Sequence, residues 1–129
     1  MMAAASAWAA LGETDPVPMV LVSLQDPADH MFCVVGEPEH CTDLLFCESV
    51  NALATDAPSD DMWVADPWLN VMCRLSDYPA RAAAKFAKWQ AANKRIGWIK
   101  GPQGPGWYPP VGAYSTKFGA AGLDVITAP

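Results

Sequence analysis

The sequence predicts an α+β fold, with a small antiparallel sheet, two to four helices and an extended C-terminal arm rich in Pro, Gly and aromatic residues. Two short apolar runs, VPMVLVSL and MFCVV, lie between Pro and Gly residues and are typical of strands. Apolar and basic residues recur at helical spacing between positions 78 and 96. Beyond Gly97, closely spaced Pro and Gly residues disfavour a regular helix.

Length and composition predict one folded unit. A chain of 129 residues, 52% hydrophobic and 17% charged, has enough apolar surface to offset the entropy lost on folding. We assign residues 1–100 to a compact α+β domain and residues 101–129 to the arm. Six Trp residues in so short a chain indicate that some indole rings remain partly exposed as contact surface.

The N-terminal part of the chain predicts a helix followed by a strand hairpin. Residues 1–12, MMAAASAWAALG, are Ala-rich, contain no Lys or Arg and end in Gly. This pattern is typical of a short helix, and it argues against a cleaved signal peptide or a membrane span. Segments 17–24 and Met31–Val35 read as strands, and the loop QDPADH between them permits an antiparallel hairpin.

Residues 38–75 predict further helical segments. Pro38 and Glu39 suit the first turn of a helix that continues to about residue 54. The acidic turn 55–61 reads as a solvated loop, because the adjacent Asp60 and Asp61 have no spaced third ligand for a cation. Segment 62–75 is apolar and its secondary structure is ambiguous, and one interpretation is a short helix that starts at Asp66, before a proline.

The best-defined element is a helix over residues 78–96. Ser76 or Asp77 can cap its start, and Gly97 can end it in a left-handed conformation. An aromatic stripe on this helix predicts core packing, and it consists of Tyr78, Ala82, Phe86, Trp89, Asn93 and Ile96. Beside it runs a basic ridge, formed by Arg81, Lys85, Lys88 and Arg95. The far side is an alanine face that would let a neighbouring helix approach closely, formed by Ala83, Ala84, Ala87 and Ala91.

Charge is divided by position along the chain. Residues 1–78 carry thirteen acids against Arg74 alone, a net charge of −12, while residues 79–129 carry seven bases against Asp124 alone, a net charge of +6. The two parts sum to the net charge of −6 of the whole chain. Segment 79–122 contains no acid. This division predicts that the basic element binds something acidic, either the N-terminal half or a partner.

The basic ridge has three interpretations. It can be a solvated surface that complements the acidic half, since surface charges contribute little beyond solubility. It can contact the phosphates of a nucleic acid, or it can dock on an acidic protein. A chain pI near 4.6 disfavours binding to a polyanion and to an anionic membrane surface.

The arm is expected to be ordered only against another surface. Its segment GPQGPGWYPPVGAY favours polyproline II conformation, and aromatic side chains along it are costly to leave in water. We expect Trp107 and Tyr108 to anchor it on another subunit or a partner. Segment 123–127, LDVIT, predicts one edge strand, paired in the same chain or in another subunit.

No catalytic or metal motif is present in the sequence. The four cysteines, Cys33, Cys41, Cys47 and Cys73, form no CxxC pair, and His30 and His40 complete no zinc spacing. Their apolar neighbours predict reduced, buried thiols rather than disulfides. GxSxG, HExxH, P-loop and GxGxxG patterns do not occur. We therefore predict no cofactor, no metal and no catalytic residue.

The expected function is a non-catalytic structural or accessory subunit that docks onto a larger protein assembly, such as a virus particle or a multiprotein enzyme. The protein is expected to be soluble, intracellular or within a virus particle, with a protein partner or a second copy of itself bound. A nucleic-acid-binding protein and a small thiol-dependent enzyme are the alternatives. The candidate partner-binding residues are Arg81, Lys85, Lys88, Trp89, Arg95, Trp98, Trp107, Tyr108 and Tyr114.

Overall fold

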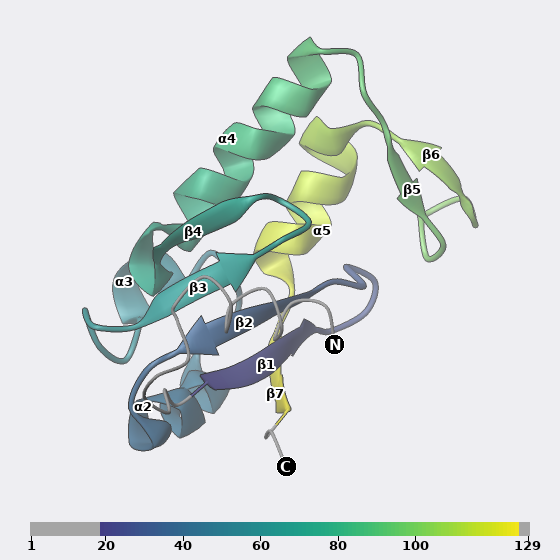
Figure 1. The fold of residues 1–129 in the computed structure, drawn as a ribbon. Coiled ribbons are helices and arrows are strands. Elements are labelled where there is room, and N and C mark those ends of the chain that lie inside the picture. Colours follow the sequence, from purple (N-terminus) through teal and green to yellow (C-terminus); the bar gives the residue numbers. More distant parts are fainter. Residues whose placement is uncertain (1–18, 127–129) are drawn as a thin grey trace.

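The computed structural model describes residues 19–126, so the Ala-rich segment 1–12 with its predicted helix lies outside the described residues. A five-stranded antiparallel sheet forms the centre of the molecule (Figure 1), in the order β4-β3-β2-β1-β7. Its strands are β1 (Met19–Leu24), β2 (Met31–Val35), β3 (Trp63–Asp66), β4 (Val71–Arg74) and β7 (Leu123–Ile126). A separate two-stranded sheet pairs β5 (Ile96–Trp98) with β6 (Gly106–Tyr108). The predicted α+β class with a small antiparallel sheet is confirmed.

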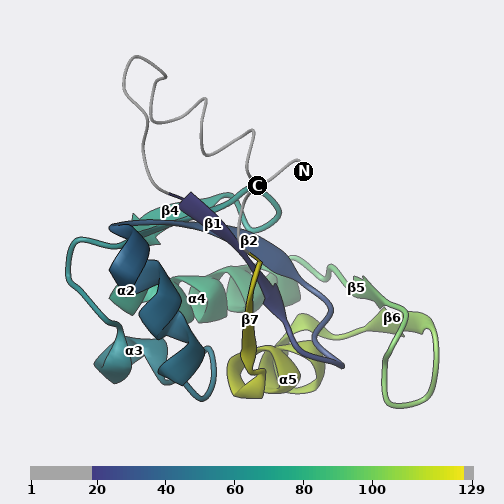
Figure 2. The ribbon, with the colours of Figure 1, turned by 90° about the horizontal axis from the view of Figure 1, so that it is seen from below.

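The helices cover one face of the five-stranded sheet (Figure 2). The α-helices of the described chain are α2 (Pro38–Asp43), α3 (Leu53–Asp56), α4 (Tyr78–Ala91) and α5 (Ser115–Ala120). Short helical turns adjoin them, namely η1 (Leu44–Phe46), η2 (Leu75–Asp77) and the irregular η3 (Pro110–Tyr114). The four helices within residues 19–126 agree with the predicted number of two to four.

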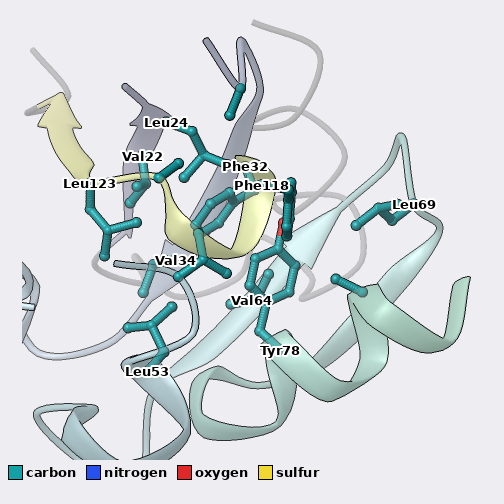
Figure 3. Packing of buried hydrophobic residues seen from close by; sticks show 14 of the residues in the cluster. Val22, Leu24, Phe32, Val34, Leu53, Val64, Leu69, Tyr78, Phe118 and Leu123 are labelled. Atoms are coloured by element: carbon teal, nitrogen blue, oxygen red, sulfur yellow. The ribbon is translucent and has the colours of Figure 1, made fainter. Parts of the chain in front are cut away.

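The main core lies between the sheet and these helices (Figure 3). Alternate residues of a strand point to one face, so Val22, Phe32 and Val64 meet the helices from the sheet side. Tyr78 and Phe118 pack against these strand side chains from the helix side. Tyr78 and the aliphatic side chains of this cluster are almost completely buried, and each apolar side chain of this size contributes about 1.5–3 kcal/mol when buried.

A row of apolar residues also crosses the outer face of the sheet. Paired residues across the strands form one row on this face, from Met72 through Ala65, Cys33 and Leu21 to Ile126. The middle of the row is buried, whereas Met72 and Ile126 at its ends are 44% and 40% exposed. Ser23, Asp124 and Arg74 lie on the same face, so polar residues border the apolar row.

The prediction of one continuous helix over residues 38–54 is wrong. The helical turns stop at Cys47, whose backbone is extended (φ −81°, ψ 127°), and α3 begins only at Leu53. Between them the N–H of Val50 donates to the carbonyl oxygen of Ala121 at 3.0 Å. Backbone N–H groups of this segment are hydrogen-bonded to a distant part of the chain. The segment therefore does not need a continuous helix to satisfy them.

The prediction of a short helix from Asp66 is also wrong. Residues 63–74 form the β3–β4 hairpin, with Trp63 opposite Arg74. Asn70 in its turn has φ 53°, a left-handed conformation that Asn adopts more readily than most residues. Residues of β4 alternate between buried and exposed, which is the period of a strand.

The predicted helix over residues 78–96 starts as expected but ends at Ala91. Asn93 has φ 62° and Lys94 N–H donates to the Trp89 carbonyl oxygen at 2.9 Å, so Asn93 rather than Gly97 provides the left-handed turn. Gly97 lies in β5 instead. Most of the aromatic stripe packs in the core as predicted, since Tyr78, Ala82 and Phe86 are buried, but Asn93 is exposed beyond the end of the helix. The alanine face of the helix is exposed to solvent, at Ala83, Ala84, Ala87 and Ala91.

Residues 101–126 differ from the extended arm that the sequence predicts for 101–129. They form β6, η3, α5 and β7, and Tyr114, Phe118 and Leu123 belong to the main core. The predicted edge strand is present as β7, and it pairs with β1 of the same chain. The aromatic side chains find apolar surface within their own domain, so the core assigned to residues 1–100 continues to the end of the described chain. Residues 127–129 lie outside the described residues.

Candidate functional site

Two adjoining hollows lie where the C-terminal end of α4 meets the β5–β6 hairpin, which projects from the body of the molecule (Figure 1). The His30 hollow has a volume of about 270 Å³ and is lined by Ala28, Asp29, His30, Trp68, Ile96, Gly97, Trp98 and Tyr114. The Lys94 hollow has a volume of about 330 Å³ and is lined by Trp68, Trp89, Lys94, Arg95, Ile96, Gly97 and Trp107. Because they share a wall, we treat the two hollows together as the aromatic groove.

Trp68 forms the wall that the two hollows share. It lies in the β3–β4 turn and is 42% exposed. Its ring centroid is 4.7 Å from that of His30 and 5.2 Å from that of Trp89. The turn is held from below, because the N–H of Leu69 donates to Asp66 Oδ1 at 3.1 Å. A half-exposed indole ring is thus carried by a turn that is anchored to the buried Asp66 side chain.

Trp107 forms the outer rim of the Lys94 hollow. It lies opposite Gly97 in the β5–β6 pair and is 71% exposed. A Cβ atom at Gly97 would lie only 3.2 Å from the Trp107 ring. The ring therefore packs closely on the bare backbone of Gly97, and much of its surface faces solvent.

The other predicted aromatic residues support the groove from within. Trp98 is buried, and its Nε1–H donates to the Pro27 carbonyl oxygen at 2.6 Å. Tyr114 is also buried, and its Oη donates to the Ala28 carbonyl oxygen at 2.6 Å. Tyr108 is half-buried and donates to the Gly104 carbonyl oxygen at 2.5 Å. Of the two predicted anchors, Trp107 is 71% exposed and Tyr108 is half-buried.

The predicted basic residues separate into two groups. Arg81 and Lys88 are exposed on α4 and Lys85 is half-buried there, whereas Arg95 follows the end of the helix and lies beside Lys94 in the groove. Within residues 19–126 Lys100 forms an ion pair with Asp26, and His30 Nε2 lies 2.7 Å from Asp66 Oδ2. None of the predicted basic residues pairs with an acid of the described part of the chain.

Beneath the groove lies a polar cluster, and this cluster was not predicted from the sequence. Asp66 is buried, and its Oδ2 lies 2.7 Å from His30 Nε2 and accepts the Tyr78 hydroxyl at 2.6 Å. Burial, the nearby Asp66 charge and this hydrogen bond raise the pKa of Tyr78 well above its usual range. A single acid inside the apolar run MWVADPW was the signal, because a buried carboxylate requires partners.

The cysteines do not contribute to the groove. All four are free and buried. Burial raises the pKa of Cys33 from 9.0 to about 11, and burial is also the main cause that raises the pKa values of Cys41, Cys47 and Cys73. In residues 19–126, no three His, Cys, Asp or Glu side chains are grouped so that they could hold a metal ion.

Comparison with other proteins adds no assignment to this geometry. No protein-family model, curated protein or solved structure matches the chain. Over residues 19–126, every helix is too short or too polar to cross a membrane.

Proposed function

We propose that this chain is a non-catalytic subunit that docks onto a larger protein assembly, with the aromatic groove as a contact surface. One observation carries the proposal: Trp68 and Trp107, 42% and 71% exposed, lie beside Lys94 and Arg95 in a preformed hollow. Trp and Arg are the residue types that most often supply binding energy at protein interfaces. A rigid aromatic surface loses little conformational entropy when it docks.

The outer face of the sheet supports the same proposal. Met31, Trp63, Met72 and Ile126 are each about 40% exposed on this face. Contiguous apolar patches on a protein surface often mark sites of interaction with other molecules. Two such surfaces on one small domain suit a protein that works inside an assembly.

Nucleic-acid binding is the second candidate. Exposed tryptophans next to Lys and Arg are also the residues on which single-stranded nucleic acids stack. However, Asp29 lines the groove and the chain carries a net charge of −6, and both oppose a polyanion. The third candidate, a thiol-dependent enzyme, has less support, since burial and raised pKa values disfavour the reactive thiolate.

The mass of the native particle tests the proposal. We expect the tagged full chain, sedimented from the cells that produce it, to travel as a particle larger than its 13.8 kDa monomer. Trp107→Ala should release the monomer. Ile99→Ala is the matched control, because Ile99 is also 71% exposed but does not line the groove. A monomeric wild-type chain would contradict the proposal.

A further inference from the structure

We infer that the aromatic groove recognises an acidic peptide segment that carries one large apolar side chain. This inference rests on the proposed docking function and adds the chemistry of the partner. It is drawn from the charges that line the Lys94 hollow, the surface that Trp68 and Trp107 present, and the acids at the far end of the groove.

The charges favour an acidic ligand. Lys94 and Arg95 line the Lys94 hollow, and no acid does so. Along α4, Arg81, Lys85 and Lys88 continue the positive charge over about 10 Å of helix axis, at 1.5 Å per residue. Asp124, the one acid in residues 79–126, lies in β7 at the edge of the five-stranded sheet and lines neither hollow. Carboxylates placed over the hollow would therefore meet cations whose described surroundings contain no ion-pair partner.

The shape favours one bulky side chain beside those carboxylates. Each hollow is large enough for a single large side chain, with volumes of about 270 and 330 Å³. Trp68 lines both hollows, and Trp107 packs closely against Gly97 at the rim. A Phe or Leu side chain seated between these two rings would bury apolar surface that the free protein leaves in water.

The acids at the far end distinguish a peptide from a nucleic acid. Asp29 lines the His30 hollow, and Asp26 is held nearby by Lys100 at 2.6 Å. A polynucleotide carries a negative charge at every residue and would extend over these carboxylates. A peptide can place acidic residues only over the Lys94 hollow and uncharged residues over the His30 hollow. The net charge of −6 adds to the cost for a polyanion.

Synthetic probe peptides test the inference on the full chain. The first peptide has Glu and Asp residues around a central Phe, the second replaces the acids with Lys, and the third replaces Phe with Ser. Tryptophan fluorescence and calorimetry measure their dissociation constants. We expect the acidic Phe peptide to bind at least about tenfold more tightly than either of the others, a difference of about 1.4 kcal/mol. Its affinity should fall with added salt.

Protein variants locate the binding. Lys94→Glu and Arg95→Glu should each weaken the acidic Phe peptide about tenfold, because charge reversal replaces an attraction by a repulsion. Both side chains are exposed, so folding should be retained, and near-ultraviolet circular dichroism checks this. Ile99→Ala should leave the affinity unchanged.

The outcomes separate this inference from the docking proposal. Equal binding of the acidic and basic peptides, or no binding of any peptide, overturns the acidic-partner inference. Tighter binding of an oligothymidylate than of the acidic Phe peptide overturns it in favour of a nucleic acid. A large native particle that Trp107→Ala disrupts would still support the docking function in each of these cases. A monomeric native chain would remove the docking function even if the peptide binds.

Discussion

Asp66 connects the core to the groove at the scale of single residues. Among the described residues, Asp66 is the one acidic or basic side chain that is buried. The Tyr78 hydroxyl and the Leu69 N–H both donate to its carboxylate. An ionised carboxylate only accepts hydrogen bonds, so donors on several sides are the arrangement it needs when buried. The same carboxylate contacts His30 and holds the turn that carries Trp68. Its environment therefore supports both folding and the shape of the groove.

We expect Tyr78→Phe to lower the free energy of unfolding by about 1.5–3 kcal/mol, the usual worth of a hydrogen bond to a charged group. Tyr114→Phe is the matched control, since Tyr114 is also buried but donates to the neutral carbonyl of Ala28. Its cost should be nearer 0.5–1.5 kcal/mol, approximately the worth of a neutral hydrogen bond. Urea denaturation measures both values, and an equal or reversed order would show that Asp66 does not act as a charged acceptor.

The buried thiols and phenols predict how stability changes with pH. Burial raises the pKa of Cys33 from 9.0 to about 11, and the pKa values of Tyr78 and Tyr114 are also raised. Between pH 9.0 and about 11, the Cys33 thiol loses its proton in the unfolded chain but keeps it in the folded protein. The free energy of unfolding must therefore fall as the pH rises. We expect urea denaturation to show a decreasing free energy of unfolding from pH 9.0 to about 11.

Cys33→Ala isolates the contribution of this thiol to the pH effect. The variant should lose less stability over the same pH range, whatever its stability at neutral pH. An unchanged slope would mean that Cys33 ionises as easily in the folded protein as in the unfolded chain. The other three cysteines, Tyr78 and Tyr114 would then have to account for the whole effect.

At the scale of elements, the C-terminal segment is an integral part of the domain. β7 pairs with β1 at the edge of the sheet, and the residues of η3 and α5 contribute Tyr114 and Phe118 to the core. Pro and Gly in this segment prevent a long helix, yet they still allow short elements between aromatic side chains that have apolar neighbours. The early end of α4 has a related effect, because the turn at Asn93 returns the chain toward β5 and creates one side of the groove.

Deletion of residues 101–129 should therefore unfold the protein. Removing a large aromatic side chain from a core costs about 3–5 kcal/mol, and the total stability of a domain is only about 5–15 kcal/mol. The deletion removes Tyr114, Phe118 and the strand partner of β1 together. Far-ultraviolet circular dichroism and urea denaturation should show no cooperative transition in the truncated protein.

An arm ordered only against a partner, as the sequence predicts, would give the opposite result, a folded domain that no longer assembles. Phe118→Ala provides the graded comparison, since it should remain folded and lose about 3–5 kcal/mol. If the truncated chain unfolds cooperatively, residues 101–126 are not needed for folding and form a separable arm.

For the whole molecule, basic side chains and apolar side chains both remain exposed after folding. The acids belong mainly to residues 1–78 and the bases to residues 79–129, and folding does not neutralise the bases of α4 with any described acid. The charge division read from the sequence is thus retained at the surface. Apolar surface is exposed both in the groove and on the outer face of the sheet.

We expect no binding of the full chain to single-stranded or duplex nucleic acid at physiological salt. The net charge of −6 repels a polyanion, although local cations could form a few contacts. Fluorescence anisotropy with labelled oligonucleotides measures this. Micromolar affinity with a log-log salt slope of roughly −3 to −4, the value for about four phosphate contacts, would show that the basic residues serve nucleic acid instead.

The sequence by itself determined the α+β class, the strands β1, β2 and β7, the start and most of the core face of α4, and the division of charge. These features depend on runs and periods of neighbouring residues, so a short window contains the information. It also supplied most of the candidate residues, but it could not separate Trp107, which is exposed, from Trp98 and Tyr114, which are buried. All three occur in the same kind of Pro/Gly-rich sequence.

Tertiary structure alone decided which of these side chains meet. The groove combines the loop around His30, the turn at Trp68, the end of α4 and the β5–β6 hairpin, which are far apart in the chain. The pairing of Asp66 with His30 and Tyr78, the β3–β4 hairpin and the break after η1 likewise depend on contacts between distant segments. Burial is set by the sum of such contacts, and tertiary packing can override the local preference of any one segment.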